Sequence, residues 1–321
     1  MTRQTHSRHG FSLIELLVVI ALLSLLAALS VGTFFRIRSG QLVSATETTM
    51  QKLNTGLDRI WSAERDRAEK EFVEKKLPNG IQVDSLLVAC GGSNEVDRAK
   101  AVWMLMRMKL EFPQTFAQAR TNVTVLGTIV LPARTTFQVV PNTAPTTADE
   151  ANLQAAALLY LILSEKGSRG EIFDVDSLNA WVKPITVNGY TGKCFVDAYG
   201  TPITYARFLT NEELNEAPYT KIPTVTATTS NNPFDPKGRL SSASIPAWTN
   251  RASFNTLSGI TDADMKKNFM ATVISAGPNR VWDGLNVNTT GLVTYTVNAT
   301  TNATSDNLMG YRLRKLGARG D

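Results

Sequence analysis

The sequence predicts an α+β protein: a long N-terminal helix packs on a C-terminal globular domain that holds an antiparallel sheet and extra helices. Three observations predict this class. Residues 11–35 form an apolar run with a single charge, and residues 36–77 continue it with apolar side chains on one helical face. From residue 181 onward, short β-branched runs alternate with turn signals. The composition, 43% hydrophobic and 19% charged, is that of an ordered protein.

The first element is a membrane-spanning helix behind a short polar leader. Residues 1–10 carry Arg3 and Arg8 and no acidic residue, and residues 11–35 hold only one charge, Glu15. At about 1.5 Å per residue this run crosses a ~30 Å hydrocarbon layer with some tilt. A cleaved secretory signal is the alternative, but its apolar region is usually about 7 to 15 residues long and Glu15 would be unusual in one.

Residues 36–77 are predicted to extend this helix as an amphipathic half that ends near Pro78. Charged residues fill the other face, so this half is expected to pack on a domain. The apolar positions recur at spacings of three, four and eight, and they are Leu42, Thr46, Met50, Leu53, Leu57, Ile60, Ala68 and Phe72.

Residues 78–180 read as a mixed region in which helices dominate. Helices are predicted over 96–112 and 148–166, and strands over 123–130 and 136–140. The second helix is apolar but too short to span a bilayer, so a buried core helix is expected.

Residues 181–321 are predicted to be rich in strands. Asn188-Gly189 is a strong two-residue hairpin signal. A stretch rich in Thr, Ser, Asn and Pro is expected to form a surface loop over 222–236. Late strands are predicted over 270–275, 292–297 and 309–314.

Composition excludes several functions. The two histidines, His6 and His9, both precede the apolar run, so the large domain has no imidazole for a Ser/His/Asp or Cys/His site or a His-ligated metal. No GxSxG nucleophile motif is present. The net charge is +5, but no basic run interleaved with aromatic residues suggests binding to nucleic acid.

Cys90 and Cys194 are the two cysteines of the chain, and they are far apart in sequence. They belong to no CxxC pair, so neither a zinc cage nor a redox motif is expected. Two alternatives stay open: one disulfide, if the domain lies outside the cytosol, or two buried thiols.

The stretch "GFSLIELLVVIALLSLLAALS" resembles the N-terminal signal of type IV prepilins and type II secretion pseudopilins. The resemblance implies that a prepilin peptidase cuts after Gly10, that the new amino terminus of Phe11 is methylated, and that Glu15 pairs with the amine of a neighbouring subunit. It also implies a single pass through the inner membrane, with the large domain outside the cytosol. This chain departs from the family in having Ser24 where a glycine is frequent and Gly32 where a proline is frequent.

A second, weaker resemblance lies in the C-terminal part. "VDAYGTPITYARF", residues 196–208, is similar to the "DPWGNPYxY" segment of the major pseudopilin, and "VISAGPNRVWDG", residues 273–284, is similar to its late Ser-x-Gly-x-Asp loop. That loop binds calcium in the family, so the resemblance implies a Ca²⁺ site here. It would have four candidate ligands, of which two are carboxylates. The alternative, which we favour, is that these residues form ordinary turns. The candidate ligands are Asn279, Asp283, Asp306 and Asn307.

Together these features predict a non-enzymatic structural subunit of a type II secretion pseudopilus or a type IV pilus. Its expected partners are the prepilin peptidase, other pilin or pseudopilin subunits and the inner membrane. The length of the chain favours a divergent or minor, tip-like member. A membrane-anchored adhesin or cargo-binding minor pilin is the alternative, and a membrane-anchored exoplasmic hydrolase is a more remote one.

Overall fold

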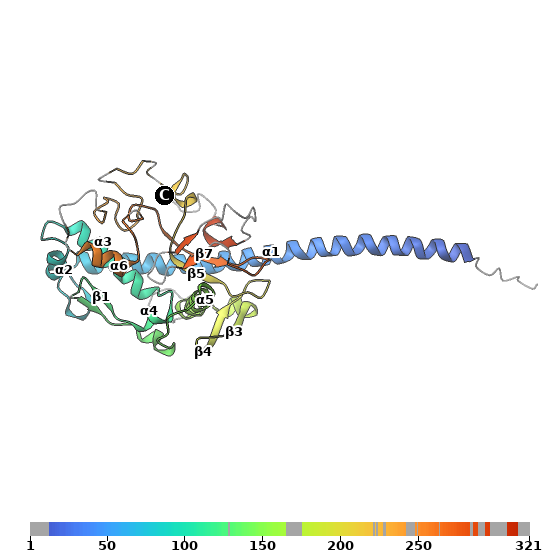
Figure 1. Ribbon diagram of the computed structural model, residues 1–321, viewed down its shortest axis with the longest axis horizontal. Helices are drawn as coiled ribbons and strands as arrows, with labels where there is room; N and C mark the ends of the chain where they lie inside the picture. Colours follow the sequence, from blue (N-terminus) through green and yellow to red (C-terminus); the bar gives the residue numbers. More distant parts are fainter. Residues whose placement is uncertain are drawn as a thin grey trace, which may run out of the picture. The chain divides into compact units, whose positions relative to one another are not determined.

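A computed structural model gives the fold (Figure 1). The chain divides into two compact units, Met1–Ala45 and Thr46–Asp321. The structure describes residues 13–127, 129–164, 175–220, 222, 224–226, 229–241, 248, 250–262, 264–282, 285–287, 293–295 and 307–313.

Helix α1 runs from Leu13 to Val73 without a break, and this confirms the predicted long helix. It contains no proline, and leucine and alanine favour the helical backbone. The chain leaves the helix just after Val73. Lys75 has a left-handed backbone (φ 55°), and the amide of Lys76 donates to the carbonyl of Glu71 over 2.9 Å. Helix α1 thus ends four residues before the predicted boundary at Leu77.

The part of α1 in the second unit buries one face, as its periodicity predicts. Met50, Leu53 and Leu57 are fully buried, and Ile60 and Phe72 are nearly so. These side chains join the main hydrophobic core of the domain. Burial of this stripe, rather than intrinsic helix propensity, therefore holds this part of α1 in place.

The domain also contains short and medium helices. The predicted helices over 96–112 and 148–166 are confirmed as α3 and α5, and α5 is buried along most of its length, as expected. Most of the described helices are α2 (Val83–Ala89), α3 (Val96–Glu111), α4 (Phe116–Arg120), α5 (Ala148–Ser164), α6 (Arg251–Ser258), and the short 3₁₀ turns η1 (Pro78–Gly80), η2 (Thr135–Val139), η3 (Val175–Trp181), η4 (Glu213–Asn215) and η6 (Gly310–Leu313).

The main sheet has five strands in the order β7-β8-β5-β6-β9. Its pairs are antiparallel except β5 with β8, which is parallel. The strands are β5 (Thr204–Thr210), β6 (Met270–Ser275), β7 (Leu285–Val287), β8 (Val293–Tyr295) and β9 (Leu308–Met309). Helix α5 packs beside β4 and β5 (Figure 1). The predicted strand over 270–275 is confirmed as β6.

Two hairpins complete the β structure. β3 (Val182–Val187) and β4 (Tyr190–Phe195) are joined by Asn188-Gly189, as predicted. Both turn residues have positive φ, 47° and 80°, which is the requirement of a type I′ turn. The second hairpin pairs β1 (Val123–Val125) with β2 (Ile129–Leu131).

Three strand predictions were wrong, two of them only in part. The single strand expected over 123–130 is broken by Leu126 and Gly127, both at positive φ, into the β1–β2 hairpin. The segment 136–140 lies between two prolines and forms the 3₁₀ turn η2 instead. β9 ends at Met309, and η6 follows because the amide of Tyr311 bonds the Thr272 hydroxyl rather than a ladder carbonyl.

The stretch 222–236 has no regular structure where it is described, and the surface-loop prediction holds for only part of it: Thr224, Thr226 and Pro236 are exposed. Ser230, Asn232, Phe234 and Asp235 are buried. Side chains satisfy the polar backbone here: the amide of Phe234 donates to the Asn232 side chain, and the amide of Asn232 donates to the Ser230 hydroxyl. This pairing lets an irregular segment enter the core.

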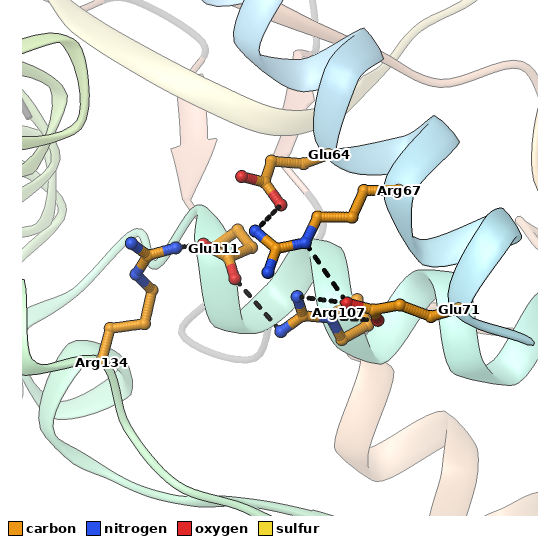
Figure 2. Close-up of polar contacts among 6 residues, drawn as sticks. All are labelled: Glu64, Arg67, Glu71, Arg107, Glu111 and Arg134. Atoms are coloured by element: carbon orange, nitrogen blue, oxygen red, sulfur yellow. Dashed lines mark hydrogen bonds and ion pairs between the residues drawn. The ribbon is translucent and has the colours of Figure 1, made fainter. Parts of the chain in front are cut away.

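A network of charged side chains fixes the end of α1 on the domain (Figure 2). The Arg107 guanidinium of α3 lies 3.2 Å from Glu71 of α1 and 3.1 Å from Glu111. Arg134 pairs with the second oxygen of Glu111. Three segments distant in sequence therefore meet through alternating charges. Glu64, Arg107 and Glu111 are buried, whereas the Arg67 side chain is 52% exposed. The network consists of Glu64, Arg67, Glu71, Arg107, Glu111 and Arg134.

Candidate functional site: the apolar start of α1 and the Asp197 turn

The start of α1 is an apolar surface. The window Leu13–Ser30 is long and apolar enough to cross a membrane, and none of it is buried in the structure. Its 18 residues span ~27 Å. The large apolar side chains from Leu13 to Leu29 are 44 to 83% exposed. A helix that is apolar on all sides needs a bilayer or other helices around it.

Polar groups in this window are few. The hydroxyls of Ser24 and Ser30 donate to the carbonyls four residues earlier, over 2.7 and 2.8 Å, so they are satisfied within the helix. Glu15 is the only ionisable side chain of the window. It lies in the first turn of α1 and is exposed. A negative charge is favoured at this end of a helix, because the unbonded amides there carry partial positive charge.

The predicted processing residues, Gly10 and Phe11, lie outside the described part of the chain, which begins at Leu13. Of the three residues that the N-terminal resemblance singled out, Gly10, Phe11 and Glu15, the structure therefore describes Glu15, the predicted assembly residue. Its role in pairing with a neighbouring amine stays a prediction.

A second feature lies where α1 meets the sheet. We call residues 197–201 the Asp197 turn. The buried Asp197 carboxylate accepts from the amides of Tyr199 and Thr201, over 3.0 and 2.9 Å. Gly200 has φ 85°, which favours glycine. Burial raises the pKa of Asp197, and these hydrogen bonds oppose that rise.

The Asp197 turn links two distant segments to α1. The Ser275 hydroxyl at the end of β6 donates to Asp197 over 2.7 Å, and the amide of Gly277 donates to that hydroxyl over 3.1 Å. The amide of Ala198 donates to the Thr46 hydroxyl of α1 over 3.1 Å. The two C-terminal segments that resemble the major pseudopilin, 196–208 and 273–284, are thus in contact. Thr46 was predicted only as a position on the apolar face of the helix, but its hydroxyl accepts a hydrogen bond from the Asp197 turn.

The candidate calcium ligands are only partly placed. The Asn279 side chain accepts from the amide of Val281 over 2.8 Å, which is a local turn contact, and Asn307 is buried. Asp283 and Asp306 lie outside the described residues. Within the described ranges, no cluster of three or more His, Cys, Asp or Glu side chains could hold a metal ion. Calcium binding stays a prediction.

Cys90 and Cys194 are free and buried. Of the two alternatives left open by the sequence, the structure therefore has two buried thiols and not a disulfide. They lie on separate elements: Cys90 follows α2, and Cys194 is on β4. Each is enclosed by core side chains. Burial raises the pKa of Cys90 to about 12, partly offset by Arg98, and that of Cys194 to about 11.

Comparison with known proteins identifies the N-terminal segment. The family model described as the prokaryotic N-terminal methylation motif matches residues 5–31, which include Gly10, Phe11 and Glu15. This motif, followed directly by an apolar helix, is consistent with a type IV prepilin-like protein. No curated protein and no solved structure matches the chain.

Proposed function

We propose that this chain is a structural subunit of a type II secretion pseudopilus or a type IV pilus. The observation that carries the proposal is the methylation motif over residues 5–31, which overlaps an exposed apolar window, Leu13–Ser30, whose one charge is Glu15. A prepilin peptidase cuts after Gly10 and methylates Phe11. The helix then holds the subunit in the inner membrane, with the domain outside the cytosol, until assembly.

Glu15 has a specific role in this proposal. After cleavage Phe11 carries a cationic amine, and the Glu15 carboxylate of one subunit compensates the amine of the next as helices stack in the filament. Either charge alone would be expensive in an apolar surrounding, so the pair favours one axial register over sliding. The domain, which has no histidine, serves as a non-enzymatic decoration of the filament.

The test separates processing from assembly. Glu15→Ala is expected to insert and to be cleaved like the wild type, yet to yield few or no filaments in a shearing assay. Ser24→Ala is the matched control, because it changes a side chain of the same span that bonds only its own helix. Glu15→Gln keeps the shape and removes the charge, and it should fail like Glu15→Ala. Normal filaments from either Glu15 variant would refute the pairing role.

A minor subunit that binds a cargo or a surface is the second candidate. A cavity in the domain favours it.

A further inference from the structure

The domain contains a cavity of about 410 Å³ beside α1. Its walls come from α1, from residues 219, 220 and 222, from residues 230–236 and from residues 268–271 at the start of β6. Small-molecule sites usually measure about 300 to 1,000 Å³ and combine apolar lining with a few placed polar groups. The cavity has the size of such a site, and filament assembly through residues 11–35 makes no use of it.

Three asparagines hold the walls in place. Asn231 bonds both the amide and the carbonyl of Ile222, over 3.3 and 3.0 Å. Asn232 donates to the Met265 carbonyl over 2.9 Å, and Asn268 donates to the carbonyls of Leu214 and Tyr219. These amides are occupied by backbone groups, so they act as supports. The cavity is therefore formed before any ligand arrives.

Helix α1 presents the charged lining. Asp58, Ser62 and Arg65 are spaced by four and three residues, so they share one face of the helix, and all three line the cavity. They are partly exposed, unlike the buried stripe of the same helix. The carboxylate and the guanidinium are of opposite sign, so a ligand with a net charge would be repelled by one of them.

The remaining lining combines hydroxyl and apolar groups. Tyr219 and Thr220, which carry hydroxyl groups, and the apolar residues Phe269, Met270 and Pro233 also line the cavity. A hydroxyl both donates and accepts hydrogen bonds, so one polyol can donate to Asp58 and accept from Arg65. The C–H faces of a sugar ring suit the apolar lining.

We propose that this cavity binds a neutral saccharide. The site lies in the domain rather than in the apolar start of α1, so its function is independent of processing and assembly. Asp58 and Arg65 fix the ligand through its hydroxyl groups, and the asparagine supports keep the site open.

Trp61 provides a reporter for this site. It lines the cavity, and its ring lies 5.3 Å from Phe234 and 5.8 Å from the guanidinium carbon of Arg65. The full chain, labelled with fluorotryptophan and held in a detergent without a sugar headgroup, gives five fluorine NMR signals for its five tryptophans. Trp61→Phe assigns the relevant signal. Maltose and N,N′-diacetylchitobiose are the probes.

The expected result is a saturable shift of the Trp61 signal by at least one probe, with the other four signals unchanged. Asp58→Asn and Arg65→Gln should each weaken binding about tenfold, as for the loss of one hydrogen bond to a charged group. Arg59→Gln is the matched control, because Arg59 is exposed on the same helix and does not line the cavity. It should bind like the wild type.

Two results would overturn the proposal. One is the absence of any shift of the Trp61 signal with either sugar at concentrations that would saturate a millimolar site. The other is binding that Asp58→Asn and Arg65→Gln leave unchanged. The four other tryptophan signals report whether each variant has folded. Filament formation by the same variants should stay normal, so a failure here is distinct from a failure of the assembly role.

Discussion

Asn54 is the residue that sets the position of α1 against the sheet within the domain. Its buried side-chain oxygen accepts from the hydroxyl of Thr272 and the amide of Val273, both over 3.2 Å. Its amide donates to Asp58, one helical turn further along α1. A buried amide needs its partners, so sliding α1 by one residue would leave these polar groups unsatisfied.

Gly310 is required by this arrangement. A methyl group at this position would lie 2.6 Å from the Asn54 oxygen and 2.8 Å from Val273. We predict that Gly310→Ala lowers the free energy of unfolding by about 1 to 3 kcal/mol, because the well-packed core must shift. Chemical denaturation followed by circular dichroism measures this. Gly40→Ala, where nothing lies within 4 Å, should leave the domain transition unchanged.

A double variant tests the contact itself. Asn54→Ala alone should destabilise the domain, because Thr272 and Val273 lose their acceptor. In combination with Gly310→Ala, the total cost should be smaller than the sum, since the alanine at position 54 relieves the close approach. Strict additivity would contradict the role assigned to Asn54.

The cysteines yield a prediction about reactivity. The raised pKa values of Cys90 and Cys194 keep both thiols protonated at about pH 8, and only the thiolate reacts. Native protein is therefore expected to resist iodoacetamide, and alkylation should become appreciable only as the pH approaches those raised values. Denatured protein without reductant should expose two reactive thiols per chain. A count of zero would mean that a disulfide joins them after all.

At the scale of elements, the contact between α1 and α3 depends on the charged network. Glu111 is 2% exposed and pairs with both Arg107 and Arg134. Its removal leaves two guanidinium groups without this carboxylate in a largely dry site. We predict that Glu111→Ala lowers the free energy of unfolding by about 3 to 5 kcal/mol.

The same two helices supply the control. Glu69 of α1 pairs with Lys100 of α3, but these side chains are 44% and 32% exposed. Glu69→Ala should therefore cost less than about 1 kcal/mol. Equal losses for Glu111→Ala and Glu69→Ala in the same denaturation assay would show that burial does not set the strength of this network.

For the whole molecule, local patterns predicted much of the fold. Helices α3 and α5, strand β6 and the Asn188-Gly189 hairpin were predicted because each depends on periodicity or turn chemistry within a few residues. Short apolar runs were ambiguous: 136–140 reads as a strand, but it lies between two prolines and forms a 3₁₀ turn.

Contacts between distant residues could not be predicted in the same way. Asp197 and Ser275 are 78 residues apart, and Asn54 and Thr272 are 218 apart. The sequence marked the two segments around Asp197 and Ser275 as motifs, but it contained no signal that they bond each other. The charged network likewise joins three segments whose charges, taken singly, look like ordinary solvated surface charges.

The central claim is that the chain is processed at the motif over residues 5–31, and mass spectrometry of the amino terminus tests it most directly. The account predicts a chain that begins at Phe11 with a methylated amine. The loss of Arg3 and Arg8 lowers the formal charge from +5 to 5 − 2 = +3. An intact Met1 in cells that contain a prepilin peptidase, or a chain that begins near Val31 as an ordinary signal peptide would leave it, would contradict the account.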